Sequence, residues 1–468
     1  MSLTAALGGF LFGFDTAVAS GTIGFLKSKF NLDLAMEGWI MSSALLGSVM
    51  GAAMAGYLSD KFGRKKILMF SGLLFLVSAI GSTFPESPTS LVLARIIGGI
   101  GVGIAAMVAP IFISELAPAR LRGRLVSLYQ LAITLGILVS YLSNNLLLKY
   151  AAENQGLSSS AFVFWDQIMV KEVWRGMYGM EVIPATFFFV FLFFVPESPR
   201  WLIKEGKFNE PLKILTKILG SQKAKQEVEE IIETVREESG NFKQLFEPGI
   251  RTALIIGLFL PFLSQLTGIT TVMYYAPTLF ENAGFGTSSA FGSAAIIGFF
   301  NMVFTFLAIW KIDQFGRKPL LIFGFLGLSL ALTLIGWKFM VSETLLENNS
   351  GMLLVFFILY IAIFAATIGP GVWVLIAEIF PTKIRGRAMS LGTLSLFVGS
   401  TFVTQTFPVL RGNLGLGSTF FLYAAVMIPT VYFVFRLVPE TKGKSLEEIE
   451  KSWLRQLDPK TKKYENPE

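Results

Sequence analysis

Long apolar stretches, each able to cross a lipid bilayer, constrain this chain more than any other feature of its sequence. About 20 apolar residues span a bilayer as a helix. Twelve such stretches cover residues 3–24, 38–58, 67–84, 90–113, 123–148, 174–195, 251–280, 289–310, 319–339, 351–375, 386–410 and 416–437. We expect an all-α membrane protein with 12 transmembrane helices, because helices satisfy their own backbone hydrogen bonds in lipid.

The composition fits a polytopic membrane protein and excludes several functions. Of the 468 residues, 53% are hydrophobic and only 15% are charged, which is too apolar for a soluble protein of this size. The absence of His and Cys excludes metal sites built on these ligands and Ser-His or Cys-His hydrolases. We expect no enzyme activity, no metal and no cofactor. The net charge of +7 is interpreted as membrane topology, not nucleic-acid binding.

Basic residues gather in alternate loops, which predicts the orientation of the chain in the membrane. The loops after spans 2, 4, 8 and 10 are rich in Lys and Arg, whereas those after spans 3, 7 and 9 carry almost none. Because short cytoplasmic loops collect basic residues, both termini are expected in the cytoplasm. Residues 1–26 are expected to form a first span and not a signal peptide. We expect a monomer in the plasma membrane, with the inner membrane of a bacterium as its location.

Loop motifs of the first half return in the second half in the same order. The sequence Asp-Lys-Phe-Gly-Arg-Lys at 60–65 returns as Asp-Gln-Phe-Gly-Arg-Lys at 313–318, and Pro-Glu-Ser at 196–198 returns as Pro-Glu-Thr at 439–441. Each interval covers an even number of spans, so the two halves share one orientation. The sequence therefore predicts two parallel six-helix repeats, the arrangement found in major facilitator transporters.

These repeats suggest a division of the chain into four parts. Two six-helix bundles are expected at 1–198 and 250–438, with a polar cytoplasmic linker at 199–249 and a cytoplasmic tail at 439–468. Apolar residues recur at helical spacing in the linker, which indicates short amphipathic helices.

Charged residues at the span ends on the predicted cytoplasmic side are candidates for a gate. Opposite charges there can latch that side when it is closed and separate when it opens, whereas simple topology and helix capping are the alternative for any single loop. The candidates are Asp60, Arg64, Glu115, Arg122, Glu197, Arg200, Asp313, Arg317, Glu378, Arg385 and Glu440.

Several motifs along the chain together resemble one known family. They are Gly-x-x-x-Asp-Lys-x-Gly-Arg-Lys at 56–65, Pro-Glu-Ser-Pro-Arg-Trp at 196–201, Gln-x-x-Gly-Ile at 265–269, Tyr-Tyr-Ala-Pro at 274–277 and Pro-Glu-Thr-Lys-Gly at 439–443. The set resembles the sugar porter family of the major facilitator superfamily, and residues 12–21 are similar to its proton-coupled, xylose-type bacterial members. The resemblance implies a secondary active transporter that imports a monosaccharide with protons by alternating access.

The resemblance also implies a sugar site between the two halves. Amides offer donors and acceptors that match sugar hydroxyls, and aromatic faces stack on the sugar ring, although an amide in a span can instead bond a neighbouring helix. The residues implied are Gln130, Gln265, Asn301, Trp373, Phe12, Tyr275, Thr270, Phe364 and Gly369.

The second half departs from the family pattern at this site. Ser264 replaces the first amide of a usual Gln pair, Thr270 stands where Asn is usual, and residues 396–397 are Leu-Phe in place of an amide and Trp. The second half should therefore form fewer hydrogen bonds to a ligand. An aldose such as xylose, glucose or galactose is the expected substrate, with a deoxy sugar or a cyclitol as the alternative.

One carboxylate lies inside the first apolar stretch, and it is the candidate proton carrier. Asp15 is the only ionisable side chain between Met1 and Leu26, and a charge at the bilayer centre costs about 2.5 to 3.5 kcal/mol. We expect Arg95 to be its partner. Pairing favours the ionised acid, and loss of that contact in a dry site favours the protonated acid. Glu181 matches a third charged position of proton-coupled relatives. The alternative is a static buried salt bridge.

Three other functions remain open from the sequence. A facilitative sugar uniporter would not need Asp15. A transport-like sugar sensor needs a long signalling tail, whereas the segment after the last span has only about thirty residues, the size of one short helical hairpin. An intramembrane enzyme would have to rely on Asp, Glu, Ser or Lys chemistry.

Overall fold

A computed structural model describes residues 1–118, 121–155, 163–237, 246, 250–311, 314–345, 350–380, 384–443 and 448. Over these ranges the regular structure is entirely helical. Eleven helices within them are long and apolar enough to cross a membrane. The predicted all-α membrane fold is confirmed.

The first half contributes six spans. They are α1 (Ser2–Phe30), α2 (Leu34–Phe62), α3 (Arg64–Thr83), α4 (Pro88–Leu116), α5 (Arg122–Glu153) and a last span divided into α7 (Val173–Gly179) and α8 (Val182–Phe193). Asp33 accepts a hydrogen bond from the N–H of Met36 at 2.7 Å and caps α2, as expected of an Asp at this position. The loop between α5 and α7 contains α6 (Val163–Asp166) and the π-helix η2 (Gln167–Lys171).

The second half contains the remaining spans. Its elements are α12 (Arg251–Gln265), α13 (Ile269–Asn282), α14 (Thr287–Lys311), α15 (Arg317–Leu345), α16 (Ser350–Ile363), the π-helix η5 (Phe364–Ile368), α17 (Gly369–Ile379) and α18 (Arg385–Leu437). The 53 residues of α18 are interrupted at Gly415, whose φ of 81° and ψ of 163° are not helical. Glycine adopts this conformation without strain. Because Gly415 separates two of the expected stretches, the eleven helices contain all twelve expected spans.

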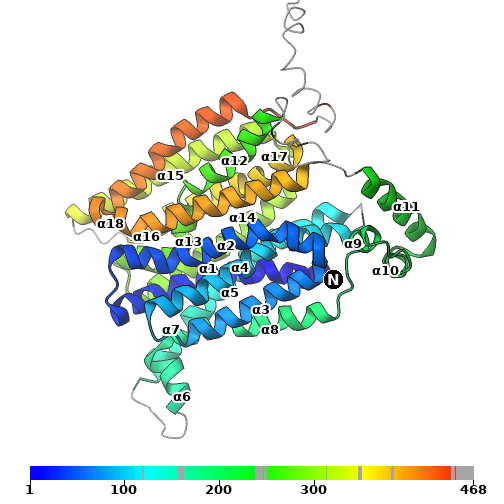
Figure 1. The fold of residues 1–468 in the computed structure, drawn as a ribbon. Coiled ribbons are helices and arrows are strands. Elements are labelled where there is room, and N and C mark those ends of the chain that lie inside the picture. Colours follow the sequence, from blue (N-terminus) through cyan, green and yellow to red (C-terminus); the bar gives the residue numbers. More distant parts are fainter. Residues whose placement is uncertain are drawn as a thin grey trace, which may run out of the picture.

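Three short helices lie between the halves. They are α9 (Pro199–Lys204), α10 (Asn209–Leu219) and α11 (Ser221–Glu237), where the sequence predicted short amphipathic helices. They gather at the same end of the molecule as the N-terminus (Figure 1). Of the predicted tail, the structure describes residues 439–443 and Glu448.

The helices form two groups that correspond to the two halves of the sequence. Within the first group α2 packs against α4 and α1 against α5, and within the second α18 packs against α15 and α12. In Figure 1 the blue and cyan helices lie together, and the yellow and orange ones lie beside them. The groups meet where α2 contacts α18, α5 contacts α14 and α1 contacts α13. Candidate residues on α1, α5, α13 and α14 therefore lie on elements that border this interface.

Candidate functional site

A buried ion pair between Asp15 and Arg95 lies inside the first half. Asp15 is on α1 and Arg95 on α4, and Nη1 of Arg95 is 3.3 Å from Oδ1 of Asp15. The two residues are 5% and 0% exposed, so water does not screen their charges. The predicted pairing is present, between two helices that the sequence separates by eighty positions.

Further contacts hold the Arg95 guanidinium in place independently of Asp15. Its Nε donates to the backbone carbonyl of Ile40 on α2 at 3.2 Å. The guanidinium carbon lies 5.8 Å from the ring centroid of Tyr178 on α7, within the range of a cation–π contact. Nη2 has no hydrogen-bond partner among the described residues. Arg95 therefore keeps a donor available for another acceptor.

Glu181 lies at the break between α7 and α8 and is 2% exposed. It interacts electrostatically with both Asp15 and Arg95, but no direct ion pair joins it to Arg95 among the described residues. The structure thus brings two acids and one base into a single buried cluster. One of the two carboxylates cannot be balanced by Arg95 when both are ionised.

Hydroxyl groups of the second half fix the orientation of the Gln265 amide. Ser264 donates its hydroxyl hydrogen to the carbonyl of Pro261 at 2.6 Å, so its oxygen is left to accept from Nε2 of Gln265 at 3.1 Å. Oε1 of Gln265 then accepts from Thr270 at 2.7 Å and from Ser400 at 3.0 Å. Both lone pairs of this oxygen are used. The amide retains one N–H that no described residue accepts.

The other predicted sugar residues lie on four helical elements, each half-buried or buried. Gln130 on α5, Trp373 on α17 and Phe364 in η5 are half-buried, and Asn301 on α14 is buried. A Cβ atom added at Gly369 would lie 3.5 Å from the Phe364 ring, so these two positions are close in space.

Two aromatic contacts border the same region. Phe12 of α1 meets Phe397 of α18 edge to face, with ring centroids 5.9 Å apart, so this pair joins the two halves. Tyr275 is fully buried, and its ring lies 4.9 Å from that of Phe407. Tyr275 therefore packs inside the protein in this conformation and does not line open space.

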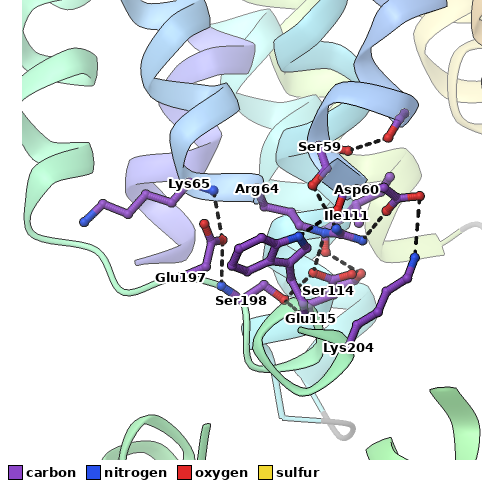
Figure 2. A network of polar contacts seen from close by, with 12 residues as sticks. Ser59, Asp60, Arg64, Lys65, Ile111, Ser114, Glu115, Glu197, Ser198 and Lys204 are labelled. Atoms are coloured by element: carbon purple, nitrogen blue, oxygen red, sulfur yellow. Dashed lines mark hydrogen bonds and ion pairs between the residues drawn. The ribbon is translucent and has the colours of Figure 1, made fainter. Parts of the chain in front are cut away.

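Four predicted gate residues of the first half form one network, shown in Figure 2. Arg64, the first residue of α3, pairs with Glu115 of α4 at 3.2 Å and with Asp60 of α2 at 2.9 Å. The hydroxyl of Ser198 donates to Glu115. Glu197 accepts from the backbone N–H of Lys65 at 3.0 Å. Its carboxylate therefore caps α3, where a negative charge is favoured.

The second half repeats this arrangement. Arg317 at the start of α15 binds Glu378 of α17 through two nitrogens, at 2.8 and 3.1 Å. Thr441 donates to Glu378 at 2.6 Å. Glu440 accepts from the backbone N–H groups of Arg317 and Lys318 at 3.0 and 3.2 Å. Although burial raises the pKa of Glu440, these hydrogen bonds and that from Lys442 outweigh it and lower the pKa below its ordinary value.

The ion pairs of these two networks join elements within one half each. Arg200 is on α9, where it interacts electrostatically with Glu115. Arg385 begins α18 and Arg122 begins α5. The side chain of Arg122 and all of Asp313 fall outside the described residues. The expected latch between the halves is therefore not formed by the described pairs in this conformation.

At the opposite end of the spans the two halves are joined directly. Glu37 of α2 accepts from Arg411 of α18, whose Nη2 is 3.0 Å from each carboxylate oxygen. Lys27 of α1 lies 3.4 Å from the same carboxylate. Ser42 donates to Oε1 of Gln405 at 2.7 Å. This end of the interface is closed by polar contacts.

The sequence analysis did not identify Ser400, Glu37 or Arg411. Glu37 and Arg411 each stand one residue outside a predicted span, at ends that the topology places on one side of the membrane. This placement was a usable signal for the pair. Ser400 had none, because a lone Ser in an apolar span usually bonds its own backbone.

Comparison with known proteins gives consistent matches over the whole chain. A sequence profile described as "Sugar (and other) transporter" matches residues 1–453. The chain is 41% identical over 457 residues to the arabinose-proton symporter of Bacillus subtilis, covering 97% of this chain and 95% of that protein. It is 38% identical over 497 residues to the D-xylose-proton symporter of Escherichia coli, covering 99% and 96%.

Solved structures agree with these sequence matches. An inward-open structure of the E. coli xylose transporter XylE matches with a TM-score of 0.80 and 36% identity, covering 97% of this chain and 99% of that one. A partially occluded inward-open structure of the same transporter gives a TM-score of 0.81 and 35% identity, covering 95% and 98%.

Proposed function

Because this chain belongs to the sugar porter family of the major facilitator superfamily, we propose that it imports a monosaccharide together with protons by alternating access. The observation that carries the proton-coupled part of this proposal is the buried cluster of Asp15, Arg95 and Glu181. Such charges are expensive inside a membrane and are retained where they serve transport. The relatives named as arabinose- and xylose-proton symporters support the same function.

Asp15 is the proposed proton carrier, because it pairs with the one base of the cluster. When a proton neutralises Asp15, its attraction to Arg95 is lost. Arg95 stays anchored by the carbonyl of Ile40, and its unused Nη2 donor can turn to Glu181. When the proton leaves, the Asp15–Arg95 pair forms again. Each proton that enters down a potential of 100 mV contributes about 2.3 kcal/mol, roughly a 50-fold bias toward sugar accumulation.

The sugar is proposed to bind between the halves, among the amides and aromatic rings described above. Gln130 offers an amide from the first half, and no hydrogen bond to another described residue uses it. Gln265 offers only one N–H, because Thr270 and Ser400 occupy its oxygen. The first half should therefore form most of the hydrogen bonds to the sugar. A pentose is the first substrate to test, given the names of the relatives, and a cyclitol follows because the myo-inositol transporter of Bacillus subtilis is 33% identical over 460 residues.

We propose that this conformation faces the cytoplasm. Its halves are joined at the end of Glu37 and Arg411, and the networks at the other end stay within each half. The basic loops support a cytoplasmic location for that other end and for both termini, and we propose the inner membrane of a bacterium as the location of the protein. The proposed units are the bundles 1–198 and 250–438, the linker 199–249 and the tail 439–468, in a single functional chain.

The experiment is sugar uptake into proteoliposomes under an imposed pH gradient, alkaline inside. We expect labelled arabinose or xylose to accumulate above its external concentration, and a proton ionophore to collapse the accumulation. Glucose, galactose and myo-inositol serve as the comparison panel. Uptake that only reaches the external concentration, with and without the gradient, would instead identify a facilitative uniporter. No uptake of any of the five would contradict a sugar substrate of this class.

A further inference from the structure

The ion pair between Glu37 of α2 and Arg411 of α18 joins the two halves. The Glu37 side chain is 2% exposed and that of Arg411 is 12% exposed. A single guanidinium nitrogen contacts both carboxylate oxygens. Charges this well shielded from water interact strongly, unlike those of exposed pairs.

The helices that carry this pair pack backbone to backbone. A Cβ atom added at Gly38, the neighbour of Glu37, would lie 2.4 Å from the carbonyl oxygen of Gln405 on α18. Only glycine permits so close an approach. The amide of Gln405 also donates to the carbonyl of Ala35 at 3.2 Å. The contact between α2 and α18 is therefore specific in geometry as well as in charge.

Aromatic side chains and a cavity surround the pair on its two sides. The guanidinium of Arg411 lies 5.9 Å from the ring centroid of Phe407, which itself packs on Tyr275. A cavity of about 400 Å³ is lined by both charges and by Lys27, and by Asn282 at the end of α13. The pair thus stands between two packed aromatic rings and a cavity that borders both halves.

We propose that Glu37 and Arg411 form a latch that closes the outer side of the transporter in its inward-facing state. The proposal rests on the proposed alternating-access function and topology. Opening the outer side must separate α2 from α18, and water then solvates both charges. The ion pair therefore stabilises only the state in which the outer side is closed, and it shifts the equilibrium between the two states toward that state.

The test uses the natural absence of cysteine in this chain. Ser42 is 0% exposed in the closed contact, so a Ser42→Cys variant reports on opening of the outer side. The rate at which purified Ser42→Cys protein in nanodiscs reacts with a maleimide is measured first. Glu37→Gln and Arg411→Gln are then added singly and together. No sugar is needed for this measurement.

We expect each single substitution to raise the labelling rate about tenfold, which corresponds to ~1.4 kcal/mol of population shift. The rise should be larger for Glu37→Gln, because Lys27 still partners Glu37 when Arg411 is neutral. The double variant should also label faster than the Ser42→Cys protein. Its fold-increase in labelling rate should be far smaller than the product of the two single fold-increases, because neither substitution then leaves a buried charge without its partner.

A matched control is Glu172→Gln. Glu172 lies in the same half as Lys29 and pairs with it at 2.6 Å, so its loss should change the labelling rate less than twofold. An equal rise in this control would indicate general loosening and would overturn the latch.

Unchanged labelling in both single variants would also overturn it. If the single variants do not fold, labelling of the double variant at the rate of Ser42→Cys alone would contradict the proposal. If the labelling rates change as expected but none of the tested sugars is taken up, the latch is supported and the proposed substrate is wrong.

Discussion

At the scale of single residues, hydroxyl groups determine how Gln265 can meet a ligand. Thr270 and Ser400 donate to its oxygen, so its amide turns an N–H toward any sugar that binds. Ser400 does not need to touch the sugar to have this effect. It is a positioning residue in this account, and its role can be separated from a purely structural one.

Replacing Ser400 with Ala should loosen the amide and raise the KM for sugar roughly fivefold, about the value of one hydrogen bond near 1 kcal/mol. The maximal rate should change little, because the proton cluster lies in the other half. Ser400→Thr keeps the hydroxyl and should restore the KM. Initial uptake rates over a range of sugar concentrations measure both quantities. A fall in the maximal rate alone would contradict the positioning role.

Glu172 gives a pH-dependent prediction outside the spans. Burial raises its pKa, but hydrogen bonds from Lys29 and Arg175 outweigh burial and lower the pKa from 4.5 to about 2. A carboxyl of this kind stabilises the fold above its unfolded pKa and loses that contribution as the pH falls toward its folded value. Glu172→Gln should therefore cost ~1 kcal/mol at pH 7, with the difference shrinking between pH 4.5 and 2. Thermal unfolding across this range tests it, and a difference independent of pH would contradict it.

Part of the site was predictable from individual residues, and part was not. Asp15 is conspicuous because it is alone in an apolar span, and Arg95 was the charged group available to it. The hydrogen bond from Ser400 to Gln265 was not predictable. It depends on how α18 is aligned along α12, and sequence spacing does not encode this alignment. The packing of Tyr275 inside the second half is a property of this conformation.

At the scale of elements, a glutamate after the last span of each half caps a distant helix of the same half. Glu197 caps α3 and Glu440 caps α15 through backbone N–H groups. The two loops thereby hold three elements of each half together at the end that bears the short helices. This arrangement gives each half the rigidity that rocking about a central site requires.

The repeat predicts that these two glutamates are equivalent. Glu197→Gln and Glu440→Gln should each lower the free energy of unfolding by ~1 kcal/mol, as for loss of a helix cap. The double variant should show the sum, because the sites are far apart. Glu210→Gln on the exposed first turn of α10 is the control. Chemical unfolding in detergent measures the values, and a large effect at only one of the two sites would contradict the equivalence.

The sequence predicted the elements better than their interruptions. Apolar length identified every span, since lipid permits little else, but the helices run past the apolar stretches into charged residues such as Lys27 and Lys29. The break at Glu181 and the π-helix η5 were not expected from the sequence, whereas the break at Gly415 falls between two expected spans.

At the scale of the whole molecule, the repeated loops were sufficient to predict two parallel halves, because they preserve the order and orientation of the spans. They could not predict which end is closed, since a transporter sequence must be compatible with both states. The observed pairs within each half and the Glu37–Arg411 pair between halves supply that information. The candidate gate residues form clusters of charge within each half, while their role as a gate and their contacts in the other state stay a prediction.

The central claim is that Asp15 carries the proton that drives sugar accumulation. The most direct measurement compares Asp15→Asn with the unmodified protein in proteoliposomes, in two assays on the same preparation. Asparagine cannot release a proton but fills nearly the same space. We predict that sugar exchange across the membrane without a gradient continues, while accumulation driven by a pH gradient is abolished. Accumulation that survives in Asp15→Asn together with sugar-dependent proton entry would contradict the account.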